Sequence, residues 1–503
     1  MKVKRSITWV ALGVVVAAAF IVCLPLFRSG FFVTDDGGWM IVRLSAFYQS
    51  LREGQFPVRF LGRLNDGYGY PVANFLYPGF MYVGSLIHFV GIPFVETVKI
   101  ILGSSVVVGS VFTYLWLRRY FTVAASIVGT MGFVSAPYLL FDVYRRGSVG
   151  EVLAIAVAAI GLYAVAGRYR WLFSIAVATL ILSHNSLALL YLGFYVFYIT
   201  VSGSWSRLWL AFGLGIGMAS FFWAPALYER KYVIFDSIAV ANPFEYFITV
   251  HSVWLVGVPG FIGAIVSLVA GKKLRKEKFL MLCMMGITLF MVIPISSFIW
   301  KSEVLSHIMQ FPYRFLSLAL FIGAWLIAFA VSYSRRIVAV ILFVIVIGFG
   351  IRSVYTAHAG VSTVKEPEGY YTTNEATTTV ANEYMPRWIA VLPTDHVAKR
   401  LEFYGGQGSF TQKNVNSQLV DVVVHAAEPS VVQVNTLYYP GWGASLDGQK
   451  VIIEYKNPMG IMRIPVPAGD HRLIVSFRET VSRFVADVVS LLSGIAFFVF
   501  LFV

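Results

Sequence analysis

The sequence predicts a polytopic α-helical membrane protein with a small β-rich domain outside the membrane. Of the 503 residues, 58% are apolar or aromatic and only 13% are charged, against roughly 25% charged residues in soluble proteins. About twelve runs are apolar over a length close to that of a membrane-spanning helix, which needs about 20 residues. Residues 352–483 instead have the composition of a soluble domain. An ordinary cytosolic enzyme, a disordered chain and a disulfide scaffold are therefore excluded.

The first apolar run, Ile7–Phe27, follows three basic residues. A secretory signal has a similar pattern, but this run is long and no small-x-small cleavage site follows it. We interpret it as a retained anchor. The other predicted spans are Phe94–Leu117, Val123–Phe141, Val152–Ala166, Leu172–Leu182, Leu187–Val201, Leu208–Ala224, Val253–Ala270, Phe279–Ile299, Phe315–Val331, Ile337–Ile351 and Phe484–Val503.

The charge distribution predicts the orientation in the plasma (inner) membrane. Short cytoplasmic loops are enriched in Lys and Arg. With a cytoplasmic N-terminus, the six segments placed inside carry the whole net charge of +14, so both termini are predicted to be cytoplasmic and nucleic acid is not expected as a partner. The basic residues are Lys2, Lys4, Arg5, Arg118, Arg119, Arg168, Arg170, Arg207, Lys272, Lys273, Arg275, Lys276, Lys278, Arg335 and Arg336.

The two cysteines, Cys23 and Cys283, fall inside apolar runs. We expect two buried thiols and no disulfide framework. No Cys/His group has the spacing of a zinc site, and no Gly-rich phosphate loop of the Walker type occurs. ATP hydrolysis by this chain is therefore not expected.

The first outer loop, residues 28–93, is predicted to hold structure at the membrane surface. Its apolar residues at helical spacing indicate an amphipathic interfacial helix, which Gly54 and Pro57 end. The stretch Phe75–Val90 is interpreted as a second surface or re-entrant element, because counting it as a span would place Arg118 and Arg119 outside. The residues at helical spacing are Met40, Leu44, Phe47 and Leu51.

The segment 352–483 is predicted to form an extracytoplasmic β-sandwich, and 484–503 a final span. Asp447-Gly448 and Gly469-Asp470 are typical of hairpin turns. The alternating runs that predict strands are Val420–Val424, Val431–Leu437, Val451–Tyr455 and Leu473–Phe477.

Two adjacent carboxylates, Asp35 and Asp36, follow the first span. Such a pair can supply a general base or a ligand for a divalent cation. The alternative is a solvated turn in which an Asp caps the interfacial helix.

Arginines occur outside the membrane, against the usual charge trend. Arg145 and Arg146 can bind a phosphate or carboxylate through the guanidinium fork. Two interpretations of Glu151 are weighed evenly: it is a site residue, or it is the last residue of a capping box that begins at Ser148. Arg314, at the head of an apolar helix, suits an anionic lipid head group, and ordinary snorkelling is its alternative.

Three further polar residues interrupt apolar runs near the outer face. His184 and Asn185 are candidates for a polar site inside the bundle, or for a hydrogen-bonded structural pair. Glu229 ends the seventh span and either faces the same cavity or is an exposed loop charge.

These segments together resemble known bacterial membrane proteins. The stretches Arg52–Arg59, Asn65–Pro71 and Tyr77-Pro78 resemble proteins labelled 6-pyruvoyl-tetrahydropterin-synthase-related. The C-terminal Tyr-Tyr-Pro-Gly-Trp, Leu-Asp-Gly and Val-Pro-Ala-Gly-Asp-His segments resemble YfhO-like proteins. Both groups are similar to GT-C glycosyltransferases. The pterin label does not imply that activity, because the zinc-binding histidine set is absent.

The resemblance implies a glycosyltransferase whose sugar donor is linked to a polyprenyl phosphate. It matches Asp36, with Asp35 beside it, to the acidic motif of the first outer loop. It also matches Arg146-Gly147 with Glu151, His184-Asn185 and Phe311–Arg314 to elements of the similar sequences. The DxD spacing of metal-dependent oligosaccharyltransferases is absent, so a divalent cation stays an open alternative.

The predicted function is transfer of a sugar, with inversion, to an extracytoplasmic glycan, lipid or protein. Asp36 is the predicted base and Arg314, with Arg145 or Arg146, the predicted phosphate partner. Two alternatives are a transporter or flippase for a lipid-linked glycan and a non-enzymatic cell-envelope assembly protein.

Overall fold

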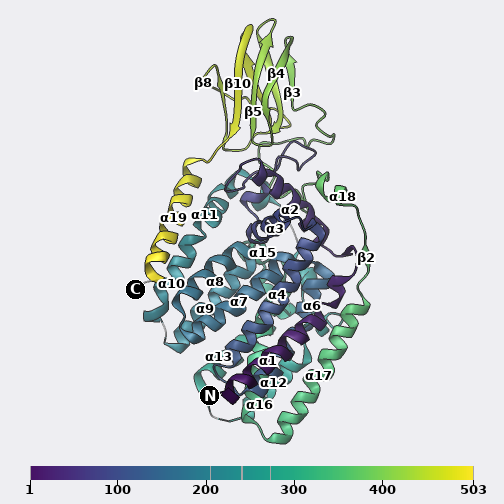
Figure 1. Ribbon diagram of the computed structural model, residues 1–503, viewed down its shortest axis with the longest axis vertical. Helices are drawn as coiled ribbons and strands as arrows, with labels where there is room; N and C mark the ends of the chain where they lie inside the picture. Colours follow the sequence, from purple (N-terminus) through teal and green to yellow (C-terminus); the bar gives the residue numbers. More distant parts are fainter. Residues whose placement is uncertain (1, 204, 239–241, 272, 502–503) are drawn as a thin grey trace.

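A helical module makes up most of the molecule, and a β-rich region stands at one end of it (Figure 1). The computed structural model describes residues 2–203, 205–238, 242–271 and 273–501. Lys272, one of the predicted cytoplasmic basic residues, lies outside the described residues.

Each predicted span corresponds to a helix or to a broken pair of helices. Among the described residues, seven helices are long and apolar enough to cross a membrane. The number is nine if each of two bent helix pairs is counted as one span. Helices α8 and α12 and the apolar part of α1 are shorter, so the count of twelve and the orientation stay predictions. The helices are α1 (Lys2–Val22), α4 (Phe94–Leu117), α5 (Val123–Val134), α6 (Pro137–Phe141), α7 (Val149–Gly167), α8 (Arg170–Ser183), α9 (Asn185–Ser202), α10 (Trp205–Met218), α11 (Ser220–Glu229), α12 (Val258–Val269), α13 (Arg275–Met291), α14 (Ser297–Trp300), α15 (Glu303–Met309), α16 (Leu316–Tyr333), α17 (Arg336–Ala359) and α19 (Val481–Leu501).

The thiols differ from the prediction in one respect. Cys23 is buried, but Cys283 is exposed on α13. An apolar run predicts that a residue lies in a helix. Whether its side chain is buried against other helices depends on the direction in which it points from the helix axis.

The segment predicted as the first outer loop folds into two helices, α2 (Gly37–Arg52) and α3 (Gly79–Phe89). Helix α2 ends just before Gly54, which has a φ of +96°. Ten of its 16 residues are buried, because it packs against α3, α4 and the short helix α18 (Glu368–Thr372). It is therefore embedded in protein on several sides, unlike a helix that only rests on a bilayer. With 11 residues, α3 is too short to span.

The chain beyond α17 returns over this loop before it enters the β-rich region. Helix α17 continues to Ala359, past the predicted boundary at Arg352, and strand β2 (Thr363–Val364) pairs with β1 (Phe31–Phe32). Arg43 of α2 donates hydrogen bonds to the side chain and carbonyl of Thr378. The segment before the first strand of the β-rich region is therefore attached to the helical module.

The β-rich region contains two antiparallel sheets, of orders β4-β5-β10-β7-β8 and β3-β6-β9. In β5, Val420, Val422 and Val424 are buried and the residues between them face outward. The strands are β3 (Leu401–Gly405), β4 (Gly408–Val415), β5 (Leu419–Ala426), β6 (Ser430–Leu437), β7 (Trp442–Leu446), β8 (Gln449–Val451), β9 (Ile461–Val466) and β10 (Gly469–Phe477).

Two local predictions for this region differ from the structure. Of Val451–Tyr455, only Val451 belongs to a strand, β8. Gly469-Asp470 begins β10 after the chain has changed sheets, so it is no hairpin turn. Asp447-Gly448 does join β7 to β8, with positive φ at both residues, as a tight hairpin turn requires.

Candidate active site

The backbone holds the two predicted site segments against each other. The amide of Asp35 donates to the carbonyl of Arg145 (3.0 Å), and the amide of Asp36 donates to the carbonyl of Arg146 (2.8 Å). Gly147 makes this close approach possible, because its φ is +64° and a Cβ there would lie 2.7 Å from Oγ1 of Thr34. Glycine is therefore required after Arg146 for a steric reason, because the segment around Thr34 packs directly against it.

Three carboxylates converge on the guanidinium of Arg146. Its Nη2 lies 3.2 Å from Oδ2 of Asp36, and its Nη1 lies 3.3 Å from Oδ1 of Asp142 and 2.5 Å from Oε1 of Glu151. Asp142 and Glu151 are fully buried, whereas the Asp36 side chain is 30% exposed. Asp36 is thus the carboxylate of this group that an incoming molecule can reach.

Glu151 links the arginines to the bundle. Its Oε1 accepts a hydrogen bond from Nε of Arg314 at 2.9 Å, and Nε2 of His184 lies 3.5 Å away. Its Oε2 accepts from the hydroxyl of Tyr138 at 3.3 Å. The side chain of Ser148 makes no capping hydrogen bond at the start of α7. The alternative interpretation of Glu151 as part of a capping box is therefore wrong. The buried carboxylate instead fixes two guanidinium groups.

Arg314 lies in the turn that leads into α16. Its Nη1 donates to the carbonyl of Met309 at 2.7 Å and to side-chain oxygens of Ser186 and Gln310 at 3.3 and 3.1 Å. Its guanidinium also lies over the ring of Phe311. Among the described residues, Nη2 of Arg314 makes no hydrogen bond, which leaves one donor group for a ligand.

Asp36, Arg146 and Arg314 line one cavity of about 530 Å³. His184 and Asn185 also line it, although both make structural bonds: Nδ1 of His184 accepts from the amide of Leu187, and the Asn185 side chain donates to the carbonyl of Phe75. Away from this polar end, the cavity wall is apolar and comes from α9, α10 and α11. The apolar lining residues include Leu189, Leu192, Ile216, Trp223 and Leu227.

The cavity is also lined by polar residues that sequence reasoning missed, and they include Arg43, Tyr77, Arg230, His307 and Glu383. Burial raises the pKa of the Tyr77 hydroxyl to about 12, which keeps it a neutral donor. Glu383 is 7% exposed, and its Oε2 accepts a hydrogen bond from the amide of Ala381. It comes from the segment that returns over α2, so only knowledge of the tertiary fold could have found it.

The predicted site residues Asp35, Arg145 and Glu229 do not line this cavity. Arg145 lies 3.6 Å from Asp35, and both side chains are largely exposed. Glu229 is neither an exposed loop charge nor part of the cavity lining. It is fully buried and receives two hydrogen bonds from Arg483 of α19, both at 2.8 Å.

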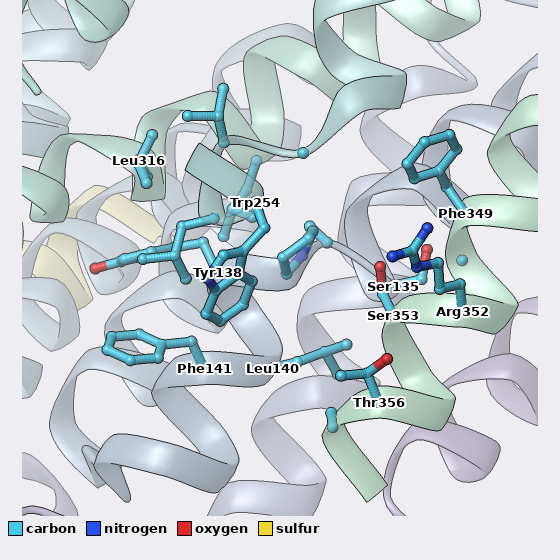
Figure 2. A pocket seen from close by; sticks show the side chains of 18 of the residues that line it. Ser135, Tyr138, Leu140, Phe141, Trp254, Leu316, Phe349, Arg352, Ser353 and Thr356 are labelled. Atoms are coloured by element: carbon cyan, nitrogen blue, oxygen red, sulfur yellow. The ribbon is translucent and has the colours of Figure 1, made fainter. Parts of the chain in front are cut away.

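A second cavity, of about 780 Å³, lies between α5, α6, α12, α16 and α17. Figure 2 shows Tyr138, Phe141 and Trp254 on one side of it, and Phe349, Arg352 and Ser353 on the other. Arg145 lines this cavity, not the one that contains Asp36.

The carboxylates of the site do not form a metal-ligand set. Asp36, Asp142 and Glu151 all face the guanidinium of Arg146. Within the described part of the chain, no group of three or more His, Cys, Asp or Glu residues is arranged to hold a metal ion. No step is therefore derived through the divalent cation left open by the sequence.

No protein-family model matches the chain. No curated protein matches it. Solved structures similar to it include the arabinofuranosyltransferase AftD from Mycobacteria, which has 17% identity and a TM-score of 0.48 over 71% of this chain and 27% of that chain. ArnT from Cupriavidus metallidurans bound to undecaprenyl phosphate has 17% identity and a TM-score of 0.47 over 72% of this chain and 68% of that chain. The oligosaccharyltransferase AglB from Archaeoglobus fulgidus, in complex with an inhibitory peptide and a dolichol-phosphate, has 13% identity and a TM-score of 0.45 over 75% of this chain and 61% of that chain.

Proposed function

We propose that the chain is a membrane glycosyltransferase that uses a polyprenyl-phosphate-linked sugar as donor and an extracytoplasmic glycan, lipid or protein as acceptor. The observation that carries the proposal is one cavity with a reachable carboxylate, a cation with a free donor group and an apolar wall. That wall includes Leu189 and Leu227, which are 52% and 63% exposed, so it continues to the outer surface of the bundle where lipid chains lie.

The polar end of the cavity matches the head of such a donor. The guanidinium of Arg314 binds the phosphate that joins the sugar to the lipid, and the isoprenoid chain lies along the apolar wall. Because Glu151 and the carbonyl of Met309 fix the arginine, it needs no rearrangement when charge develops on the leaving oxygen. Preorganised charge of this kind commonly makes the largest contribution to catalysis.

The reaction is a single displacement. Asp36 takes the proton of an acceptor hydroxyl, and the oxygen of that hydroxyl forms a bond to the anomeric carbon of the sugar. The bond between that carbon and the phosphate oxygen breaks, and its electron pair leaves with the polyprenyl phosphate beside Arg314. One displacement inverts the anomeric carbon. Arg146 accepts no proton in this scheme; it holds the carboxylate of Asp36 in place through Oδ2.

The convergence of Asp36 and Arg314 on one cavity favours this function over an assembly protein without a reaction site. A transporter for a lipid-linked glycan would use the same arginine but would not need Asp36. The two therefore differ in whether a sugar bond is made.

The phosphate role is tested with the Arg314→Ala variant. In membrane vesicles, sugar transfer from radiolabelled polyprenyl-phosphate sugars is measured beside binding of the same donors to purified protein. Wild-type protein is expected to transfer at least one of them. Arg314→Ala is expected to lose about tenfold or more in donor binding, because a charge-assisted hydrogen bond is removed.

Arg145→Ala is the matched control, since Arg145 is adjacent to the site but lines the other cavity. It is expected to bind donor like the wild type. Unchanged donor binding by Arg314→Ala would remove the phosphate role. If the protein moves the donor across the vesicle membrane but transfers no sugar, it is a transporter and the proposed transferase function is wrong.

A further inference from the structure

We infer that the second cavity, between α5, α6, α12, α16 and α17, binds an anionic phospholipid whose head group is held by Arg145 and Arg352. This site is separate from the one proposed for the sugar donor, since the two cavities share no lining residue. The inference does not depend on glycosyl transfer.

Charge is the first reason. Arg352 lies on α17, a helix of high mean hydropathy. Its guanidinium makes no ion pair or hydrogen bond among the described residues, yet it lines an otherwise mostly apolar cavity. Arg352 is exposed where the cavity opens, so its guanidinium is available to an anionic head group. Arg145 adds a second cation, and its only ion pair is the 3.6 Å contact with the exposed Asp35, which is worth little.

The shape of the cavity is the second reason. Arg352 is accompanied by the hydroxyl groups of Ser135, Ser353 and Thr356 (Figure 2). Apart from Arg145 and Ser362, the rest of the wall is apolar or aromatic. Trp254 and Phe349 at its edge are 55% and 37% exposed, so it opens on the side of the bundle that faces lipid. One phosphate with attached acyl chains matches this division into a cationic polar part and an apolar part.

The two cavities meet at one pair of chain segments. Val33 and Arg145 line the phospholipid cavity, and the neighbouring Asp36 and Arg146 line the candidate active site. The backbone bonds from Asp35 to Arg145 and from Asp36 to Arg146 hold the segments together. A lipid in the second cavity therefore packs against the segments that position Asp36.

Native mass spectrometry of the full chain in detergent tests this site. Phosphatidylglycerol and phosphatidylcholine with the same acyl chains are added separately. The wild type is expected to retain phosphatidylglycerol at least about tenfold better. The Arg145→Ala/Arg352→Ala variant is expected to lose that preference, as charge-assisted hydrogen bonds are removed. Arg336→Ala, an exposed arginine at the other end of α17, is the control and is expected to behave like the wild type.

A steric variant separates lost binding from lost folding. Ser353→Trp places a large side chain in the cavity from α17 and leaves both arginines in the sequence. It is expected to reduce retention of phosphatidylglycerol while the protein stays monodisperse. Equal retention of both lipids by the wild type would overturn the inference. So would full retention by the double variant, or retention of undecaprenyl phosphate in place of phosphatidylglycerol.

Discussion

Two buried glutamates of this molecule face arginines, and only one of the two pairs with arginines that line the cavity of the candidate active site. Glu151 contacts Arg146 and Arg314, which both line a cavity. Glu229 is bonded by Arg483, by the Asn74 amide at 2.9 Å and by the Tyr439 hydroxyl at 2.8 Å. It joins the first outer loop, α11, the β-rich region and α19.

The difference lies in whether the arginines reach a cavity. Arg483 is fully buried and donates also to the carbonyl of Pro440; its Nη1 is buried without a hydrogen-bond partner among the described residues, and it lines neither of the two cavities described above. Arg314 keeps Nη2 free, and Arg146 holds a partly exposed Asp36. Burial and ion pairing are common to both clusters, whereas, of the two, only the cluster of Glu151 and its arginines has access from one of these cavities. If Glu151 supports the proposed reaction, its loss should reduce sugar transfer, whereas loss of Glu229 should reduce stability alone.

The largest effect is expected at Glu151, because its removal disturbs both properties. Glu151→Ala leaves two buried guanidinium groups without their shared partner, which costs about 3–5 kcal/mol of stability. It also releases Arg314 and Arg146, and misplacing groups at a site typically costs about 10²-fold in rate. Thermal unfolding and transfer per folded molecule are measured together. Wild-type transfer by the folded fraction would contradict the positioning role.

Glu229→Ala is expected to reduce stability by a similar amount, about 3–5 kcal/mol, since Arg483 is left buried without its partner. Transfer per folded molecule is expected to stay within a few-fold of the wild type. Unfolding is followed by thermal melting in detergent, and activity is normalised to the folded fraction. A specific loss of transfer at unchanged stability would place Glu229 in the site after all.

A small, pH-dependent effect is expected from an exposed pair in the β-rich region. The hydrogen bond between Asp447 and His471 (2.6 Å) raises the pKa of His471 and lowers the pKa of Asp447. The pair is fully charged between the depressed pKa of Asp447 and the ordinary histidine pKa of about 6.5. Its stabilisation is lost as pH rises through the raised pKa of His471, and again as pH falls through that of Asp447.

The measurement compares the melting temperatures of the wild type and Asp447→Asn at pH 5.5 and pH 9. The difference is expected to be larger at pH 5.5 and smaller than the effect of Glu229→Ala at either pH, because exposed pairs contribute little. An equal difference at both pH values would show that the charge of His471 is irrelevant.

Much of the helical architecture could be predicted, because apolar length and loop charge act locally along the chain. The helix α2, the breaks around Asp36 and Arg314 and the strands β5, β6 and β10 follow from such patterns. Glu383 and Arg43 could not be found, since their place in the cavity depends on a segment that returns from far along the sequence. Glu229 could not be predicted either, since a charge at the end of an apolar run does not reveal that it is buried against Arg483.

The C-terminal aromatic motif illustrates the same limit. Tyr439 packs inward onto Glu229, and Trp442 packs against Phe60 and Phe477. The motif therefore joins the β-rich region to the helical module. Its aromatic composition alone was also compatible with a surface that stacks on sugars.

The most direct measurement is sugar transfer by Asp36→Asn beside Asp35→Asn, with both proteins inserted in membrane vesicles. Asparagine keeps the shape of the side chain but removes the base, so Asp36→Asn is expected to lower transfer about 10²- to 10⁴-fold while donor binding at Arg314 persists. Asp35→Asn is expected to transfer at close to the wild-type rate. Near-normal transfer by inserted Asp36→Asn would contradict the assignment of this cavity as the reaction site.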